Sequence, residues 1–133
     1  MILLDTSFLI DVLKKREYAV NKAVEIVNKD KLATTYVNIY ELLFGIYNKK
    51  TINHEKELNA VKDLKNKLEI LTLDENSTKK SAEIGGELMI KGQIIGDTDN
   101  MIAGIMLCNG INTIVTRNVD HFKRIKGIEV ETY

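Results

Sequence analysis

Residues 1–11 read MILLDTSFLID, and this stretch decides how the rest of the chain is interpreted. Its apolar run ends at Asp5, and the hydroxyl residues Thr6 and Ser7 lead into a helical segment. The pattern predicts a strand, a turn and a helix, with a carboxylate at the carboxyl end of the strand. Ligands of open α/β sheets bind at those ends. Because an unpaired charge at the edge of a core is costly, Asp5 must face water, cap the helix or bind a cation.

The composition predicts one globular domain over residues 1–133, with 44% hydrophobic and 29% charged residues. No apolar run approaches the ~20 residues that cross a bilayer, and Asp5 and Asp11 interrupt the N-terminal run where a secretory signal would be apolar. One cysteine, Cys108, fits a reducing compartment and is expected to be a core thiol. We therefore expect a cytoplasmic protein without a membrane partner. Because the net charge is zero, any polyanion would have to be bound by local basic clusters or by metal ions.

The hydrophobic pattern predicts an α/β fold in which strands alternate with helices. Strands are expected at 2–4, 32–35, 68–73, 112–116 and 128–130, and helices at 8–15, 17–28, 36–48, 53–68, 74–91 and 97–109, with at most a helical turn at 119–123. Such alternation implies a short, mainly parallel central sheet covered by helices on both faces, a three-layer α/β/α arrangement. Asn53 and Asp97 suit N-cap positions.

A second carboxylate, Glu41, lies inside a helix that is apolar almost all round and is therefore expected to be buried. The exceptions line one narrow stripe of the helix: Asn38, Glu41, Gly45 and Asn48. The stripe is either a thin solvent-facing side or a polar cleft into which Glu41 points. A buried carboxylate in such a cleft needs a cation or hydrogen bonds.

A third segment, GDTDNMIAG at 96–104, places Asp97 and Asp99 at the start of a very apolar helix. One carboxylate can cap this helix, and the helix dipole favours negative charge there. A cap needs only one aspartate, so the second points to another role. Carboxylates that gather at one sheet edge repel one another unless a cation lies between them, and hard oxygen ligands select Mg²⁺ or Mn²⁺.

A fourth segment, TIVTRNVDHF at 113–122, leads a strand into Thr116, Arg117 and Asn118 at the same expected edge. Hydroxyl, guanidinium and amide groups together can orient a phosphate or a water molecule. The segment can equally be an ordinary strand-to-helix turn with Asn118 as N-cap. His121 lies beside it and is expected to have no more than a minor role in catalysis.

Four short motifs in this order resemble a PIN-domain ribonuclease, and among these the VapC toxins of prokaryotic toxin–antitoxin pairs. The motifs are LLDTS at 3–7, ELLFG at 41–45, IGDTDNMIAG at 95–104 and VTRNVDHF at 115–122. The resemblance covers essentially the whole chain. It implies a PIN-like fold and RNA cleavage with Mg²⁺ or Mn²⁺ by a homodimer that a small cognate antitoxin restrains. Residues 18–68 are expected to supply the dimer face or the antitoxin groove.

The resemblance also implies roles for individual residues. Asp5, Glu41 and Asp99 match the acidic cluster, in which Asp5 and Asp99 would bind the metal, with Glu41 and Asp97 as further candidates. Ser7 and Thr116 match the supporting polar residues. The chain has Asn118 where relatives alternate between an acidic residue and asparagine, which weakens a second metal site or leaves Asn118 to hold water. The candidates for gripping the RNA backbone are Arg117, Lys123, Arg124 and Lys126, although the last three also fit a solvated basic tail.

Other functions fit parts of the sequence. An aspartyl-phosphate phosphatase needs a second aspartate two residues after Asp5, where the chain has Ser7, and a receiver domain needs a lysine where it has Thr116. A PIN-domain nuclease of RNA processing would share the same site. A non-catalytic PIN domain that only binds RNA or a protein would be expected to have lost one of the carboxylates. We therefore expect a metal-dependent endoribonuclease.

Overall fold

The computed structural model describes residues 1–51 and 53–133, and in these ranges a five-stranded parallel sheet lies at the centre of the molecule. The strands are β1 (Ile2–Leu4), β2 (Leu32–Thr35), β3 (Glu69–Leu71), β4 (Thr113–Val115) and β5 (Glu129–Glu131), in the order β3-β2-β1-β4-β5. All four strand pairings are parallel, so the expected mainly parallel sheet is fully parallel.

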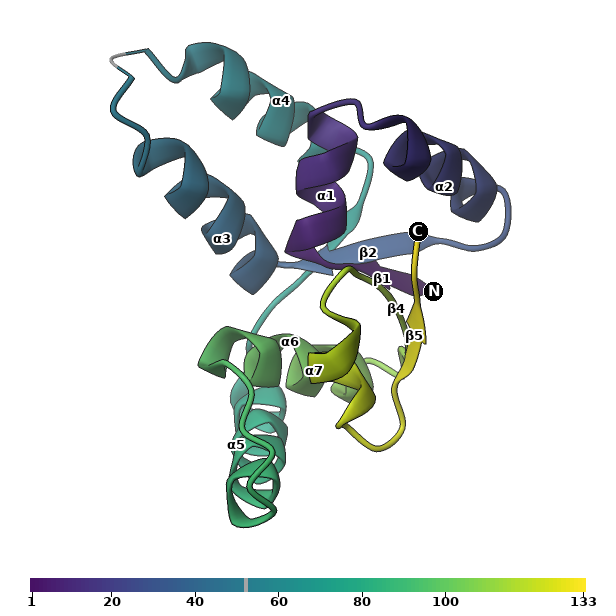
Figure 1. Ribbon diagram of the computed structural model, residues 1–133, viewed down its shortest axis with the longest axis vertical. Coiled ribbons are helices and arrows are strands. Elements are labelled where there is room, and N and C mark those ends of the chain that lie inside the picture. Colours follow the sequence, from purple (N-terminus) through teal and green to yellow (C-terminus); the bar gives the residue numbers. More distant parts are fainter. Residues whose placement is uncertain (52) are drawn as a thin grey trace.

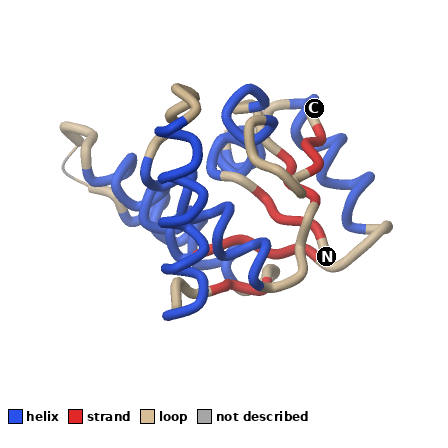
Figure 2. Tube along the Cα trace, turned by 90° about the horizontal axis from the view of Figure 1, so that it is seen from below, coloured by secondary structure: helices blue, strands red, loops and turns tan. Residues whose placement is uncertain are grey.

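Helices cover both faces of the sheet, as the alternation of strands and helices predicts (Figure 1). The described ranges contain α1 (Thr6–Leu13), α2 (Glu17–Val27), α3 (Tyr36–Tyr47), α4 (Glu55–Lys65), α5 (Glu75–Ile90), α6 (Asp97–Cys108) and α7 (Val119–Lys123). Helices α1 to α4 lie on one face and α5 to α7 on the other, with the strands side by side between them (Figure 2). None of these helices is both long and apolar enough to cross a membrane.

The central strand β1 explains why the chain forms two cores. Its residues are all buried, with Leu3 packed in the core under α5, α6 and α7, and Ile2 and Leu4 in the core under α1 to α4. Successive side chains of a strand point to opposite faces, so a wholly apolar strand needs a helix layer on each side. The chain supplies both layers.

The order of the strands places a crevice at the carboxyl end of β1. From β1 the chain moves outward through β2 and β3 on one side, and then returns to β4 and β5 on the other. Strand order reverses between β1 and β4, and ligands of open α/β sheets bind at such a switch point. Leu4 pairs with Val115, so Asp5 and Thr116, the next residue of each chain segment, emerge together there.

Helix α3 differs from its prediction as a helix buried on all sides. Its residues Tyr36, Tyr40, Phe44 and Tyr47 are about half exposed or more, while Ile39, Leu42 and Ile46 are buried. The apolar pattern could not show this, because α3 projects with α4 as an arm and only one of its faces meets other elements (Figure 1). Cys108, in the last turn of α6, is likewise exposed and not a core thiol.

The helix starts also differ in detail from the predicted caps. Gly96 takes the N-cap position of α6, and the side chain of Asp97 therefore does not cap the helix. His54 takes that position in α4, although the Asn53 side chain still accepts a hydrogen bond from the Glu55 N–H (2.9 Å). Asn118 occupies the predicted N-cap position of α7, and within the described chain its side chain makes no capping hydrogen bond.

The close approach of α5 and α6 depends on Gly104. A Cβ atom added there would lie 2.7 Å from the Ser81 backbone nitrogen and 2.8 Å from the Ser77 carbonyl oxygen. The Ser81 hydroxyl donates to the Ser77 carbonyl oxygen (2.7 Å) and so stays flat against its own helix. The nearest atom to such a Cβ would be this Ser81 hydroxyl oxygen, which could rotate away, but the other two atoms belong to the α5 backbone and could not. Gly104 therefore sets how closely α6 packs.

We expect Gly104→Ala to destabilise the protein by about 3 kcal/mol, because overpacking against backbone forces the two helices apart. Gly45→Ala is the matched control, since no described atom lies within 4 Å of a Cβ there. The control should stabilise the protein by roughly 0.5–1 kcal/mol, the usual gain over glycine in a helix. Urea unfolding of both variants measures the difference, and equal stabilities would contradict this account of α5–α6 packing.

Candidate functional site

Asp5 is buried at the carboxyl end of β1, with a residue exposure of 2%. Its Oδ2 accepts hydrogen bonds from the Thr116 hydroxyl (2.6 Å) and the Ser7 hydroxyl (3.1 Å), and its Oδ1 accepts one from the Asn38 amide (3.2 Å). Asp5 also stands at the N-cap position of α1, but within the described chain its side chain caps nothing. Of the three expected roles, the geometry excludes facing water and capping the helix. Hydrogen bonds from Thr116, Ser7 and Asn38 compensate the buried carboxylate, and cation binding stays a prediction.

Glu41 points into the polar cleft rather than into solvent. Its Oε1 accepts a hydrogen bond from the Thr6 hydroxyl (2.6 Å) at the start of α1, and its Oε2 accepts one from Thr98 (3.3 Å) on α6. Asn38, one turn earlier on α3, donates to both Asp5 and Thr6. Of the four residues in the polar stripe of α3, Asn38 and Glu41 therefore line the crevice, whereas Gly45 and Asn48 are exposed.

The start of α3 is held rigidly, which fixes where Glu41 can reach. Thr35 and Asn38 form a reciprocal cap, in which the Thr35 hydroxyl accepts from the Asn38 N–H (3.1 Å) and the Asn38 side chain accepts from the Thr35 N–H (3.2 Å). Such a capping box satisfies two helix-end donors at once. The same Asn38 side chain carries the hydrogen bond to Asp5, so one residue both starts α3 and joins it to β1.

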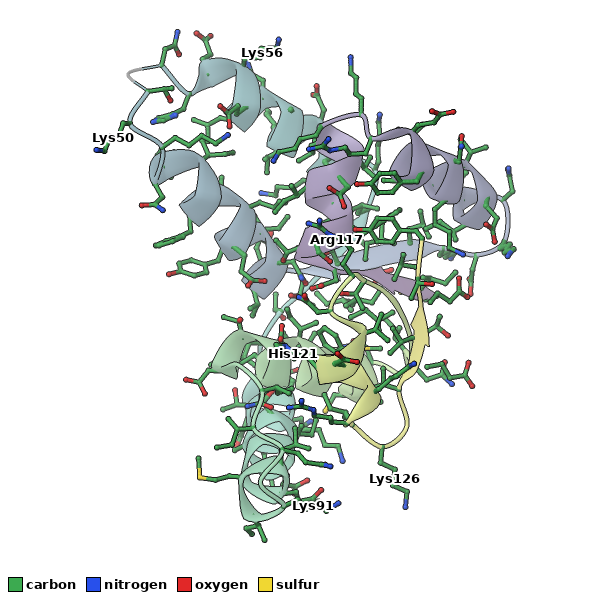
Figure 3. All side chains as sticks on the ribbon, viewed as in Figure 1. Lys50, Lys56, Lys91, Arg117, His121 and Lys126 are labelled. Atoms are coloured by element: carbon green, nitrogen blue, oxygen red, sulfur yellow. The ribbon has the colours of Figure 1, made fainter. Side chains whose placement is uncertain are left out.

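Asp99 lies in the first turn of α6 and is buried. Its Oδ2 lies 2.6 Å from Nδ1 of His121, a residue of α7 whose side chain is partly exposed (Figure 3). His121 was expected to have no more than a minor role, yet its ring is in direct contact with one of the predicted catalytic carboxylates. The sequence contains one signal for this contact: His121 follows Thr116 closely in the chain, which keeps its side chain near the same sheet edge.

The three carboxylates affect one another electrostatically. Burial raises the pKa of Asp5, and the charge of Asp99 raises it further, against the lowering effect of the Thr116 and Ser7 hydrogen bonds. Burial also raises the pKa of Glu41, to which the charges of Asp5 and Asp99 add, while hydrogen bonds from Thr6 and Thr98 oppose the rise. Segments far apart in the sequence thus bring like charges together in a region of low solvation, where a cation relieves the repulsion.

The donor set fits a hard divalent cation that keeps much of its water. Among residues 1–51 and 53–133, no three Asp, Glu, His or Cys side chains lie close enough to ligate one ion together. Mg²⁺ is usually bound in this way, through one or two carboxylates with water and substrate oxygens completing its shell. Asp5 and Asp99 are the buried carboxylates that can serve, and Glu41 lies beside them.

Two of the predicted supporting residues join this cluster. Ser7 and Thr116 lie 3.2 Å apart, oxygen to oxygen, and both contact Oδ2 of Asp5. Asn118 is exposed, and its backbone N–H donates to the Thr116 hydroxyl (2.9 Å). Asp97 is exposed and lines an apolar pocket between α5 and α6 that includes none of the three cluster carboxylates.

The basic candidates differ in what they contact. Lys123 and Lys126 are exposed, and Arg124 donates from Nη1 to the Ile94 carbonyl oxygen (3.0 Å). Arg117 pairs through Nε with Oδ2 of Asp11 (3.2 Å). The position of Asp11 on the helix after the first strand predicts a solvated side chain, which is wrong: Asp11 is buried, because Arg117 and Tyr133 cover it.

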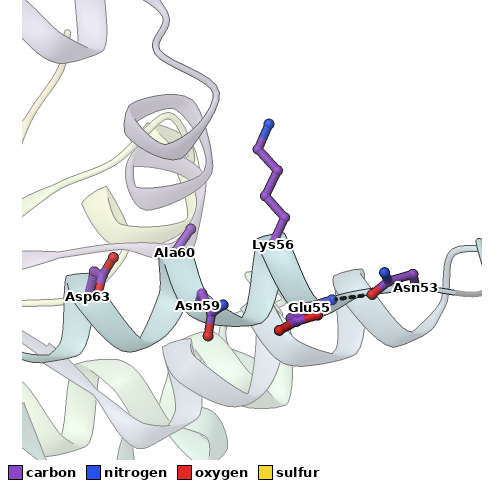
Figure 4. Close-up of a pocket in the computed structure, with 6 residues that line it drawn as sticks. All are labelled: Asn53, Glu55, Lys56, Asn59, Ala60 and Asp63. Carbon is purple, nitrogen blue, oxygen red and sulfur yellow. Dashed lines mark hydrogen bonds between the residues drawn. The ribbon is translucent and has the colours of Figure 1, made fainter.

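A pocket elsewhere on the surface does not compete with this cluster. It runs along the exposed side of α4 on the projecting arm (Figure 4). Its lining residues are Asn53, Glu55, Lys56, Asn59, Ala60 and Asp63. Apart from Ala60 these are ordinary polar side chains of an open helix surface, which does not hold a reactive group in a fixed geometry.

Comparison with known proteins agrees with the geometry. The model of the PIN domain family matches residues 2–128. A tRNA(fMet)-specific endonuclease VapC from Salmonella typhimurium is 29% identical over 98% of this chain and 96% of its own. Ribonuclease VapC1 from Methanocaldococcus jannaschii is 31% identical over 99% of this chain and 86% of its own. The crystal structure of VapBC2 from Rickettsia felis, bound to a promoter DNA fragment, matches with a TM-score of 0.87 and 27% identity, over 100% of this chain and 99% of that one.

The raised pKa values of Asp5 and Glu41 predict how stability changes with pH. Their pKa values in the folded protein lie above the ordinary values of 3.8 and 4.5. Folding therefore favours the protonated carboxyls. The stability that they contribute is fully present when the pH is below their ordinary pKa values, and it is lost as the pH rises through their raised pKa values in the folded protein. A cation that binds the ionised carboxylates restores that stability.

We expect saturating Mn²⁺ to raise the melting temperature of the metal-free protein more at pH 7 than at pH 4, where protons compete. A cation at about 100 times its dissociation constant adds about 2.7 kcal/mol, roughly 10 °C for a domain of this size. Glu41→Gln should raise the melting temperature of the metal-free protein at pH 7 and change it little at pH 3.5. Glu87→Gln, at an exposed position of α5, is the control. A Mn²⁺ effect that is equal at both pH values would contradict the assignment.

Proposed function

This chain belongs to the PIN-domain family, and we propose that it is an endoribonuclease that hydrolyses RNA phosphodiester bonds with Mg²⁺ or Mn²⁺. We propose further that residues 1–133 act as one PIN-like domain, in the cytoplasm, as the toxin of a VapBC-type pair. The observation that carries the proposal is the electrostatic coupling of Asp5, Glu41 and Asp99 at the switch point of the sheet. The VapC ribonucleases to which the chain is similar support the choice of RNA as substrate.

The residues around the cluster have separable tasks in this mechanism. Asp5 and Asp99 would hold the divalent cation, which would supply Lewis-acid chemistry at a phosphate oxygen and at the attacking water. Ser7 and Thr116 fix the Asp5 carboxylate by hydrogen bonds to Oδ2. His121 fixes the Asp99 carboxylate through Nδ1. Groups that orient metal ligands in this way preserve both affinity and rate.

Glu41 is placed to take the proton of the attacking water. Its raised pKa makes it a stronger base than an ordinary glutamate, which favours its accepting a proton. Oε1 is held by a short bond from Thr6 (2.6 Å), whereas the bond from Thr98 to Oε2 is longer (3.3 Å). Oε2 is therefore the oxygen that can exchange its partner for a water molecule during the reaction.

The exposed apolar surfaces support the proposed protein partners. Aromatic side chains of α3 and the side chains of Val24 and Val27 on α2 are exposed by about half or more. Contiguous apolar patches on a monomer usually mark protein contacts. We propose that these faces serve homodimer formation and a small antitoxin. The similarity to VapBC2 of Rickettsia felis supports the second partner.

Asp99→Asn tests the proposed function directly. We expect this variant to lose RNA cleavage by roughly a hundredfold or more, because removing a ligand charge forfeits several kcal/mol of metal-dependent stabilisation. Asp97→Asn is the matched control on the same helix turn, since Asp97 is exposed and should be dispensable. Cleavage of initiator tRNA and of unstructured RNA in Mn²⁺ buffer measures both. If the Asp99→Asn protein cleaves RNA at the rate of the parent, the proposal is wrong.

His121 should matter through Asp99 and not through its own charge. We expect His121→Leu to lower the cleavage rate about 10–100-fold, the usual cost of losing a group that orients a metal ligand. His121→Asn keeps a nitrogen donor near the place of Nδ1 and should recover most of the rate. Single-turnover cleavage and the Mn²⁺ concentration for half-maximal rate measure the effect. Equal rates for the leucine and asparagine variants would show that the contact with Asp99 has no role.

A further inference from the structure

The main chain of Arg117 is joined to the carboxylate cluster. Arg117 follows Thr116 directly after β4, and its backbone N–H donates to the Ser7 hydroxyl (3.0 Å). Ser7 in turn donates to Oδ2 of Asp5 (3.1 Å). Only one hydroxyl group therefore separates the backbone of Arg117 from the carboxylate that we assign to the cation. The guanidinium extends from a fixed point at the edge of the site.

That guanidinium nevertheless pairs with a different aspartate. Its Nε contacts Oδ2 of Asp11 (3.2 Å), and the Arg117 side chain is 54% exposed whereas that of Asp11 is 4% exposed. An arginine is the natural partner for buried carboxylates, yet within the described residues Arg117 forms no ion pair with Asp5, Glu41 or Asp99. Asp11 thus pairs the guanidinium with α1, while the Arg117 backbone stays joined to the cluster through Ser7.

Tyr133 completes the arrangement on the other side of Asp11. Its hydroxyl donates to the same Oδ2 (2.8 Å), and its ring packs edge-on against Phe8 with centroids 4.8 Å apart and stacks on Tyr18 at 5.9 Å. Burial and the bond to Asp11 raise the pKa of the Tyr133 hydroxyl, so it stays a proton donor. A hydrogen bond from Tyr133 and an ion pair with Arg117 therefore converge on one oxygen of a carboxylate that is removed from water.

The outer end of Arg117 remains available to a ligand. Within the described residues, no hydrogen bond or ion pair uses its two terminal nitrogens. With Nε committed to Asp11, those nitrogens form an end-on pair of donors, the geometry that binds two oxygens of one phosphate. Figure 3 shows Arg117 between α1 and the loop that leads into α7.

We propose that Asp11 and Tyr133 are positioning residues that hold Arg117 beside the carboxylate cluster, where it binds a phosphate of the RNA strand next to the scissile one. This inference rests on the proposed function, because it names how the substrate of that site is held. It also explains why the pairing is useful: an arginine free to rotate would neutralise the cluster and compete with the divalent cation. A lone surface ion pair contributes little, but a buried carboxylate fixes its partner.

A double-mutant cycle on RNA cleavage tests this proposal. We expect Arg117→Gln and Asp11→Asn each to raise KM roughly fivefold to tenfold, with kcat within about twofold of the parent. If Asp11 acts through Arg117, the double variant should have the KM of Arg117→Gln alone, because neighbours that act together are not additive. Loss of one phosphate contact should also lower the slope of log KM against log salt concentration by about 1. Lys91→Gln, at the far end of α5, removes the same charge and should change neither quantity.

Three outcomes would overturn the proposal: a parental KM and salt slope for Arg117→Gln, effects of the two single variants that multiply in the double variant, or an equal effect of Lys91→Gln. If the Asp11→Asn protein does not fold, Tyr133→Phe is used in its place, because the Tyr133→Phe change removes only one hydrogen bond to Asp11. Its KM should rise about twofold to threefold, and only when Arg117 is present. If the parent cleaves no RNA, the proposed function fails. The dissociation constants of the same variants for RNA then decide on Arg117 separately.

Discussion

The buried carboxylate of Asp5 is the constraint on which the rest of the site depends. It sits at the end of the central strand, where solvent is excluded by both helix layers, and its two oxygens are satisfied by side chains from α1, from the end of β4 and from α3. Removing a carboxylate from water is costly unless hydrogen bonds compensate. The three donors Ser7, Thr116 and Asn38 must therefore stay in place. They tie together segments more than thirty and more than a hundred residues apart.

The site is stabilised only in part by these hydrogen bonds. They lower the pKa of Asp5, but burial and the neighbouring carboxylates raise it by more, so the ionised cluster is strained without a cation. The fold tolerates that strain because the two hydrophobic cores on either side of β1 hold the strand and its flanking helices. Proteins commonly keep such locally unfavourable charge at the places where they bind or react. In the proposed function, relief of this repulsion is what would favour a divalent cation at the cluster.

Asp11 shows the other way to bury a carboxylate. Asp5 and Asp11 both belong to the first strand–helix unit, yet Asp11 pairs with Arg117 and accepts a hydrogen bond from Tyr133. Among the described residues, by contrast, no lysine or arginine pairs with the carboxylates of the cluster. One arginine serves two purposes in this arrangement. It compensates a charge in the core, and it presents two donors at the edge of the site. A chain with zero net charge thereby acquires a local positive group beside an acidic one.

Features that depend on local order along the chain could be predicted from the residues. The apolar run before Asp5 predicts the central strand, the alternation of strands and helices predicts the parallel sheet, and the strand ends place Asp5 and Thr116 at one edge. The polar positions of α3 and α6 add Glu41 and Asp99 as candidates for that edge. Which face of each element turns inward could not be predicted in this way. The contact of His121 with Asp99, the burial of Asp11 under Tyr133 and the exposed aromatic side of α3 all follow from that choice. Each joins segments whose relative rotation no residue pattern specifies, because it is set by packing across the whole domain.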